Sequence, residues 1–561
     1  MQNAAQKVVQ QQMQITILDP RHGVVDLTEK TAWIGLLLAG AVFFTAEVTA
    51  QEAGTADALS PQVANSMEGS AAPNNSSNTP AWRIAPSIST DLTYTDNVAL
   101  VKNNKQSDFV TRISPGVKIE GRGGHVTGSL DYHWQQYLYA KDSGRNGQQR
   151  SLNANGQAEL IDQWFYVDGR GSISQQALSA FGTQSVANDV VNNNRSETST
   201  YQLSPYIKGN FPGWADYLLR FTGSRTKSAQ GELSVGSGTT TKAWSGRLSG
   251  DSQFKKLGWT VDAAQQTIER STARDTQSKR LTGTLHYKID PQVRLSATFG
   301  RESDDYGSVQ PQWRSVRGLG VDWAPTDRTS VILNKERRSF GDSYNANFTH
   351  RTALTAWKLS QSKNINTPNE QLLTTGLGSA FDLLNLQLTT QVPDPVQRAQ
   401  QANMILQQAG ISPNAQAFGA IVTSRVYISR RKEASFAITG ARNIVTLSAD
   451  KSDNQSLGTG GAVADDFSLS PNIRQSGFTA SWAHKLTPDM ALTLNGRRSH
   501  NKGDSAGLDT QLDMLSLMLT AKLGEKTSAT VGLRRTSSDA ASTTANSYDE
   551  QAVTGSLSIN F

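Results

Sequence analysis

WRIAPSISTDLTY (residues 82–94) and DFVTRISPGVKIEG (residues 108–121) show the pattern that decides the fold. In the first stretch Ile84, Ile88 and Tyr94 share one parity, while Arg83 and Asp91 fall on the other. A period of two sends successive side chains to opposite faces of a strand. The second stretch separates its residues in the same way, with Phe109, Ile113, Val117 and Ile119 on one face and Arg112, Ser114, Lys118 and Glu120 on the other.

The alternation returns along the chain in segments such as RLTGTLHYKI, VRLSATFGRE and GFTASWAHKL. Most of these segments are about ten residues long, the length with which a tilted strand crosses a bilayer. Short connections at 290–292 and 487–489 alternate with long polar ones at 177–196, 225–243 and 451–474. Short turns at one end and long loops at the other are typical of an outer-membrane barrel, with the short turns in the periplasm.

Residues 81–561 are therefore predicted to form an all-β, antiparallel transmembrane barrel in the bacterial outer membrane. We expect about 20 strands, within a range of about 18–22. Tryptophans near strand ends fit the aromatic girdle of such a barrel. The alternative is a soluble β-sandwich or propeller, whose strands also alternate. The even spacing and the heavily charged polar face favour the barrel.

The front of the chain is predicted to be removed on export. Lys30 precedes an apolar run at 31–46, and a small-residue site ends at Ala50. These features predict a signal peptide at residues 1–50, with an uncleaved anchor helix as the alternative. Residues 51–80 are small, polar and punctuated by proline, so we expect a disordered periplasmic leader there.

One region interrupts the strands. From residue 360 to 420 the alternation stops, and residues 394–412 have the apolar stripe of a helix that ends near Gly410. Counting fourteen strands before this region, with the first rising from the periplasm, predicts a partly helical insert that is periplasmic or plug-like. Residues 425–450 are rich in β-pattern but leave open one long strand or a hairpin plus a strand.

Composition narrows the possible chemistry. The chain contains no cysteine, so thiol nucleophiles and cysteine-ligated metals are excluded. Its 54 basic and 48 acidic residues are spread along the chain without the basic stripe that nucleic-acid binding requires. The histidines lie on separate strands without a repeated Ser or acidic partner, and no phosphate-binding loop is present. We expect no enzyme activity, no catalytic residue, no metal site and no cofactor.

The polar face supplies the candidate functional residues. Turning Lys or Arg towards lipid costs roughly 2–4 kcal/mol near the midplane, so these side chains are expected to line a lumen. There they either neutralise one another or select what passes. Inward Tyr137, Tyr139, Tyr166 and Tyr206 are candidates for stacking on sugar rings. The predicted lumen-lining residues are Arg112, Lys118, Glu120, Asp131, His133, Tyr166, Asp168, Arg170, Tyr206, Lys208, Arg220, Arg247, Lys288, Arg294, Asp322, Glu336 and Arg534.

The segments WRIAPSISTDLTYTDNV, DFVTRISPGVKIEGRGG, VTGSLDYHWQQYLY and TGARNIVTLSAD, with the terminal Phe561, resemble the outer-membrane β-barrel family associated with PEP-CTERM and exopolysaccharide gene clusters. The resemblance covers residues 82–561 and implies a channel or scaffold in polysaccharide export, without catalytic residues. A monomeric export channel fed by periplasmic polysaccharide-export proteins is the function it favours. A passive small-solute porin and a closed structural or adhesive barrel remain the alternatives.

QAVTGSLSINF, residues 551–561, ends the chain on an alternating segment. We interpret it as the closing strand, and Leu557, Ile559 and Phe561 as the signal read by the barrel assembly machinery. That machinery and the membrane lipids are the other expected partners.

Deleting Phe561 is expected to impair insertion into the outer membrane while synthesis and export to the periplasm continue, because the terminal aromatic residue is part of that signal. Immunoblots of separated periplasmic and outer-membrane fractions measure this effect. Normal outer-membrane levels of the shortened protein would count against the assignment.

Overall fold

The computed structural model describes residues 18–19, 23–24 and 82–561, apart from 229–237, 252–255, 272–273, 308–309, 459–464, 542–544 and most of 368–424. Within 368–424 it describes residues 384–386, 388, 398, 402 and 423. The chain divides into two units, Met1–Ala50 and Gln51–Phe561. In the first unit β1 (Leu18–Asp19) pairs with β2 (Gly23–Val24). The predicted signal peptide otherwise lies outside the described residues, as does the predicted leader at 51–80.

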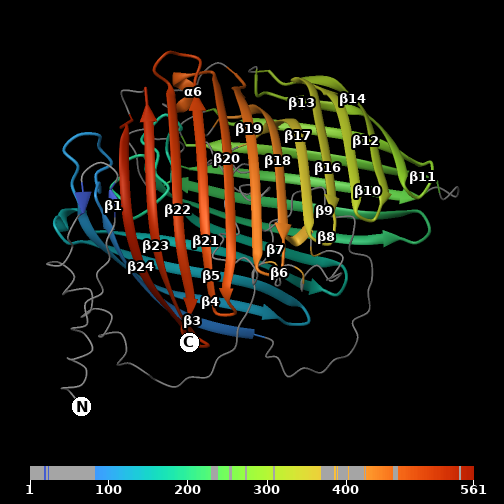
Figure 1. The fold of residues 1–561 in the computed structure, drawn as a ribbon. Coiled ribbons are helices and arrows are strands. Elements are labelled where there is room, and N and C mark those ends of the chain that lie inside the picture. The colour runs from blue at the N-terminus through green and yellow to red at the C-terminus, as the bar shows by residue number, and fades with distance from the viewer. Residues whose placement is uncertain are drawn as a thin grey trace. The chain divides into compact units, whose positions relative to one another are not determined.

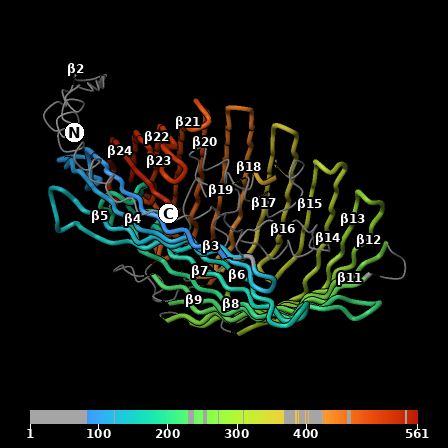
Figure 2. The backbone as a smooth tube through the Cα atoms, turned by 90° about the horizontal axis from the view of Figure 1, so that it is seen from below, coloured from blue at the N-terminus to red at the C-terminus, as the bar shows by residue number. Residues whose placement is uncertain are grey.

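In the second unit the described residues form a closed antiparallel barrel of 22 strands, β3–β24, each paired with its neighbours in the sequence (Figures 1 and 2). The predicted fold class is confirmed, with the strand count at the upper end of the expected range. The strands are β3 Trp82–Thr95, β4 Asp108–Arg122, β5 Val126–Tyr139, β6 Gly147–Ile161, β7 Phe165–Ala177, β8 Arg195–Phe211, β9 Ala215–Ser228, β10 Thr239–Asp251, β11 Leu257–Arg270, β12 Thr276–Lys288, β13 Val293–Asp304, β14 Gln312–Thr326, β15 Thr329–Arg338, β16 Gly341–Arg351, β17 Thr355–Asn366, β18 Tyr427–Thr439, β19 Asn443–Ser456, β20 Asn472–Thr487, β21 Met490–Lys502, β22 Asp509–Lys522, β23 Thr527–Ala540 and β24 Tyr548–Asn560.

The barrel closes where the last strand pairs with the first. Leu557 lies opposite Thr90 and Ile559 opposite Ile88 in the β24–β3 register. The backbone N–H of Phe561 donates to the carbonyl oxygen of Pro86 at 2.8 Å. The terminal segment is therefore the closing strand of the wall, and its role as an assembly signal stays a prediction.

The connections define two ends of the barrel. The short-turn end carries 123–125, 212–214 and 488–489. The long-loop end carries 96–107, 178–194 and 457–471, the last of which contains the short helix α6 (Asp466–Leu469). Both the start of β3 and the end of β24 lie at the short-turn end. Because short turns are periplasmic in such barrels, the long-loop end faces outward from the cell.

The predicted periplasmic position of the insert is wrong. Fifteen strands, β3–β17, precede it, so the connection 367–426 leaves and re-enters the wall at the long-loop end. β17 continues to Asn366, and β18 and β19 form a hairpin across 440–442, so residues 425–450 are neither one long strand nor a hairpin plus a further strand. The predicted count before the insert, fourteen, is one strand short. Weak alternation makes β16 hard to recognise, since it turns Asp342, Tyr344 and Ala346 to the side that is apolar elsewhere. Of the insert, Leu384, Leu388, Arg398 and Ala402 are described and are helical.

The two faces of the wall differ in chemistry. One parity carries the exposed apolar side chains, which include Leu281, Leu285, Phe299 and Leu319, the last 72% exposed. The other parity contacts loop residues from distant strands, as when Thr510 on β22 donates to the carbonyl oxygen of Ala180 at 2.8 Å. Such contacts pass through the interior, so the first parity is the outer face and the second the inner face.

An apolar outer face on a closed barrel, in which the strand backbones pair with one another, meets the demands of the lipid core. The protein is an outer-membrane β-barrel. Most of the exposed tryptophans lie at the short-turn end, where an interfacial girdle belongs: Trp82, Trp164, Trp214, Trp323, Trp357 and Trp482. Trp244 and Trp313 are exposed nearer the long-loop end. Among the described residues no helix is long and apolar enough to cross a membrane.

Leu285 on β12 tests the assignment of the faces, because it lies on the outer face within the apolar band, and Thr284 beside it lies on the inner face. Leu285→Arg is expected to destabilise the barrel by about 2–4 kcal/mol in lipid vesicles, since it exposes a cation to hydrocarbon. Thr284→Arg is the matched control and is expected to cost less. Urea unfolding in vesicles measures both; equal costs would contradict the orientation.

Candidate functional site

Oppositely charged side chains pair along the inner face. Among the predicted residues the structure joins Lys118 to Glu120, Asp168 to Arg220 and Arg294 to Asp322, with nitrogen–oxygen distances of 3.2, 2.6 and 2.5 Å. A ring nitrogen of His133 lies 2.9 Å from the carboxylate of Asp131. Arg112, Arg247 and Glu336 pair with residues that were not predicted, Asp91, Asp262 and Arg280. Lys288 and Arg170 have no ion pair with a described residue. All the predicted lumen-lining residues lie on the inner-face parity: Arg112, Lys118, Glu120, Asp131, His133, Tyr166, Asp168, Arg170, Tyr206, Lys208, Arg220, Arg247, Lys288, Arg294, Asp322, Glu336 and Arg534.

The predicted stacking of sugars on inward tyrosines does not fit the structure. Tyr166 and Tyr206 stack on each other with ring centroids 5.1 Å apart, and only 8% and 6% of their surfaces are exposed. Lys208 lies 4.4 Å from the Tyr166 centroid and Arg220 lies 4.0 Å from the Tyr206 centroid. Cations on these rings therefore occupy faces that a sugar would need.

Tyr137 and Tyr139 are buried as well, in a cluster with Val98 and Val110. Their rings belong to the packing between the wall and a loop. None of the four tyrosines offers an open ring face, so recognition of cargo cannot rest on them.

The connection between β7 and β8, residues 178–194, folds into the interior at the long-loop end; we call it the constriction loop. Phe181 packs with Tyr427, Phe467 and Ile473 from β18, α6 and β20. Further along, Val190 packs with residues of β22 and β24, Leu512 and Tyr548, and Val191 packs against the cluster of Val98 and Tyr137. One loop thus reaches inner-face residues on both sides of the β24–β3 seam.

Polar contacts also hold the constriction loop, in addition to its apolar packing. Asn501 and Thr510 both donate to the carbonyl oxygen of Ala180, at 3.1 and 2.8 Å. The Tyr548 hydroxyl donates to the carbonyl oxygen of Gln184 at 2.7 Å. The N–H of Val191 donates to the carbonyl oxygen of Val98 at 2.9 Å.

A buried ion-pair chain ties the middle of the loop to the wall. Arg534 on β23 contacts Asp189 of the loop at 3.1 Å and Glu550 on β24 at 2.8 Å. Glu550 also accepts from the hydroxyl of Thr95 at 3.0 Å. We call Asp189, Arg534 and Glu550 the latch. Removing Arg534 would leave two carboxylates close together without their cation, whereas removing Asp189 leaves Arg534 paired with Glu550.

A residue with an unusual backbone conformation supports the constriction loop from the neighbouring connection, 96–107. Leu100 has φ of 52°, in the left-handed region, and is 1% exposed. Its side chain packs with Val190, Leu512 and Tyr548. A bulky side chain is unfavourable in that region, so the packing against the loop must compensate the backbone cost.

Asp466 of α6 binds the start of the constriction loop. Its carboxylate accepts from the Ser179 hydroxyl at 2.5 Å and from the Ala180 N–H at 2.6 Å. Burial raises the pKa of Asp466 to about 6, and the neighbouring Asp465 carboxylate adds to this, although the two hydrogen bonds act in the opposite direction. Asp465 itself pairs with Arg425 at 3.0 Å and caps α6.

The constriction loop was missed from the sequence because residues 177–196 are rich in Ser, Asn and Gln and match an external loop. The available signal was the presence of Phe181, Val186, Val190 and Val191 within that polar stretch. A loop surrounded by water rarely carries several large apolar side chains, whereas a loop packed against a wall buries them. Among the described residues no group of three or more His, Asp or Glu side chains could hold a metal ion.

No protein-family model and no curated protein matches the chain. Among solved structures, the chain is 10% identical to the FrpB iron transporter from Neisseria meningitidis, F5-1 variant, apoprotein form, over 85% of this chain and 81% of that one, with a TM-score of 0.46. The siderophore receptor PirA from Pseudomonas aeruginosa is 10% identical over 85% and 80%, with a TM-score of 0.34. OccK2 (OpdF) from Pseudomonas aeruginosa is 8% identical over 85% and 98%, with a TM-score of 0.32. Likenesses with TM-scores below 0.5 do not identify a cargo for this barrel.

The pKa of Asp466 predicts that the constriction loop is held more firmly in acid. The folded pKa of about 6 exceeds the ordinary value of 3.8, so the folded state binds the proton first and docking weakens as pH rises from about 4 to about 6. The whole change corresponds to at most about 3 kcal/mol. Because the chain has no cysteine, a single spin label at Ala187→Cys reports loop mobility, which should be lower at pH 5 than at pH 7.5.

Asp466→Asn is the matched control, since it keeps the side chain's shape without the titrating proton. The label in that background is expected to have the same mobility at both pH values. A pH response that persists in Asp466→Asn would assign the effect to another group.

Proposed function

We propose that this outer-membrane barrel is a channel that exports a hydrophilic polymer, with exopolysaccharide as the cargo, and that the constriction loop closes it at the long-loop end. The observation that carries the channel proposal is the latched loop inside a wall with a polar inner face. A barrel of 22 strands is too wide for its own side chains to fill, so an inserted segment decides whether it is open. The choice of cargo rests on the resemblance to exopolysaccharide-associated barrels.

The paired charges of the inner face suit a long hydrophilic cargo. Each pair, such as Arg247–Asp262 or Arg294–Asp322, leaves little net charge while the wall stays hydrophilic. Passage requires sites that are weak enough to release what enters. A wall whose charges are mostly paired, and whose four inward tyrosines offer no open ring face, would let a sugar polymer slide without a deep binding minimum.

Opening requires the constriction loop to leave its position while the wall stays closed. Its contacts divide into apolar packing at Phe181 and Val190 and the charged latch at Asp189. The wall has its own continuous hydrogen bonds from β3 to β24 and does not depend on the loop for closure. Displacement of the loop therefore changes access and leaves the barrel intact.

In this proposal the polymer enters the barrel at one end and leaves it at the other. A periplasmic polysaccharide-export protein would bring the polymer to the short-turn end, and the constriction loop would release it at the long-loop end. The barrel acts as a monomer in this scheme, because a closed sheet has no free edge strand with which to pair a second copy.

A second candidate is a passive porin for small solutes. The observation that favours it is the same loop, if it stays in place and merely narrows the lumen. The two functions differ in what happens at the latch, since polymer export needs it to open and solute diffusion does not.

Asp189→Asn is expected to increase the open fraction of the channel in planar bilayers by up to about tenfold, since it removes the loop's charge from Arg534, which keeps Glu550 as its partner, and each loss of about 1.4 kcal/mol from the closed state shifts the ratio tenfold. Asp262→Asn is the matched control: it removes an inner-face carboxylate paired with an arginine away from the loop. A similar open fraction for both variants would show that the latch does not hold the channel closed. A barrel that conducts no current in any variant would favour a closed structural role.

Secretion separates the polymer channel from the porin. Deletion of the gene is expected to abolish extracellular polysaccharide, and wild-type protein should restore it. Polysaccharide added to the Asp189→Asn channel should also block ionic current during its passage. Unchanged secretion in the deletion strain would refute the export proposal and leave small-solute diffusion.

A further inference from the structure

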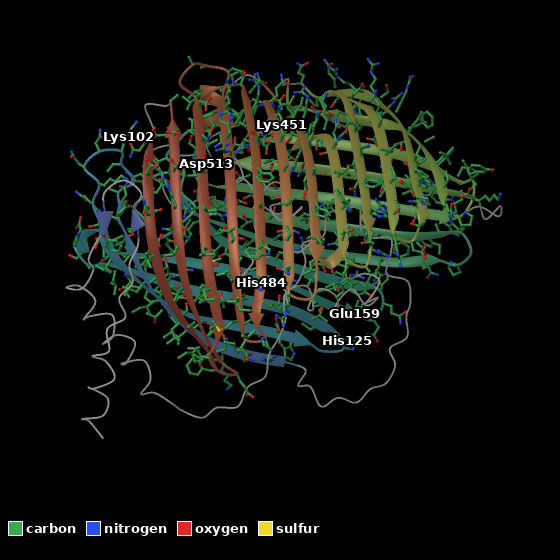
Figure 3. The ribbon with its side chains drawn as sticks, in the orientation of Figure 1. Lys102, His125, Glu159, Lys451, His484 and Asp513 are labelled. Carbon is green, nitrogen blue, oxygen red and sulfur yellow. The ribbon has the colours of Figure 1, made fainter. Side chains whose placement is uncertain are left out.

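The outer face is chemically asymmetric between its two ends. At the short-turn end the apolar band is followed by tryptophans and Tyr287. Towards the long-loop end the next outward positions are basic on strand after strand. On β13 Phe299 is followed outward by Arg301, on β14 Leu319 by Arg317, and on β19 Leu447 and Ala449 by Lys451. Figure 3 shows Lys451 towards the end that carries α6 and His484 nearer the opposite end.

These cations gather in two patches. The first lies on β13–β15 and consists of Arg301, Arg317, Lys335 and Arg337, with one carboxylate, Asp342, 3.2 Å from Lys335. The second lies on β17–β19 and consists of Lys363, Arg430, Lys432 and Lys451, with one carboxylate, Asp453, 3.5 Å from Arg430. In each patch, positive charge exceeds negative charge on a surface that faces away from the lumen.

Within the patches like charges stand directly opposite each other. Arg317 is the register partner of Arg337, which has Asp342 opposite it on its other side, and Lys432 is the register partner of Lys451. All four side chains are exposed, and none makes an ion pair with a described carboxylate. Directly opposed like charges destabilise a sheet. Their repulsion would be relieved by an anion that binds both members of a pair.

We propose that the two basic patches bind the phosphate groups of an acylated, multiply phosphorylated glycolipid in the outer leaflet of the membrane. The patches adjoin the apolar band, so a ligand anchored by acyl chains against Phe299 and Leu319 presents its headgroup at Arg317 and Arg337. Basic side chains beside a membrane surface attract anionic headgroups in this way. Paired cations about 5 Å apart on neighbouring strands suit a headgroup with more than one phosphate better than one with a single phosphate.

The glycolipid is thus a partner of the wall and is independent of what passes through the lumen. It would hold the long-loop end at a fixed depth and offset the repulsion between the opposed cations. The bare barrel in detergent keeps that repulsion.

Native mass spectrometry of the full chain in detergent tests the proposal, with diphosphoryl lipid A, monophosphoryl lipid A, phosphatidylglycerol and inorganic phosphate as probes. Diphosphoryl lipid A should stay bound most tightly, and Arg317→Gln with Arg337→Gln should weaken it about tenfold. Lys432→Gln with Lys451→Gln tests the second patch. The matched control is Lys256→Gln with Arg328→Gln, two exposed cations at the short-turn end, which should leave binding unchanged.

Equal binding to the patch variants and the control variant would overturn the proposal. Equal affinity for phosphatidylglycerol would overturn the glycolipid as the ligand, and displacement by inorganic phosphate would show a site for free anions instead. A stability measurement guards against misfolded variants: Arg317→Gln, whose other register partner is the uncharged Phe299, should raise the unfolding temperature in lipid-free detergent and reduce the further rise on adding diphosphoryl lipid A. A lower unfolding temperature without lipid would contradict the repulsion on which the proposal rests.

Discussion

The pairing of every backbone N–H and C=O inside a membrane is the constraint on which the rest of this structure depends. Hydrocarbon offers no partner to an open sheet edge, so the strands must close into a ring. Here the ring closes between β24 and β3, along a register that runs from Ala552–Thr95 to Asn560–Ser87. Closure then fixes the faces, because a slip of one residue in any strand would turn its charges outward. That register therefore decides which apolar and charged side chains face the lipid and which face the interior.

Closure also leaves a wide interior. A ring of 22 strands encloses more space than the wall's own side chains fill. The inner face remains polar, and its charges mostly pair across neighbouring strands. Among the described segments, the constriction loop enters this space together with parts of the connections 96–107 and 457–471, and apolar side chains and one charged latch hold it against the wall. In the proposed channel, permeability depends on this loop, whereas the anchoring in the membrane depends on the whole wall.

The sequence predicts the strands of the wall far better than it predicts the loops and the side-chain packing inside the barrel. Period-two alternation is local, so the strands and the parity of residues such as Arg112, Asp168 and Arg294 can be read without knowing what lies beside them. The side of the insert could not be read correctly because the predicted count of fourteen strands is one short of fifteen, and an error of one strand reverses the end; weak alternation in strands such as β16 makes such an error easy. The burial of Tyr166 and Tyr206 depends on cations from neighbouring strands, Lys208 and Arg220. The constriction loop depends on contacts with β18–β24, hundreds of residues later in the chain, and only Phe181, Val186 and the Val190–Val191 pair hint at them.

The central claim is that the constriction loop closes a polar lumen. Its most direct test is the single-channel conductance of a variant in which residues 180–193 are replaced by a short Gly-Ser linker between Ser179 and Asn194. The account predicts a barrel that inserts normally and has a steady conductance several-fold above the wild-type value. A variant that inserts normally and conducts no more than the wild type would contradict it, because the loop would then not be what blocks the way.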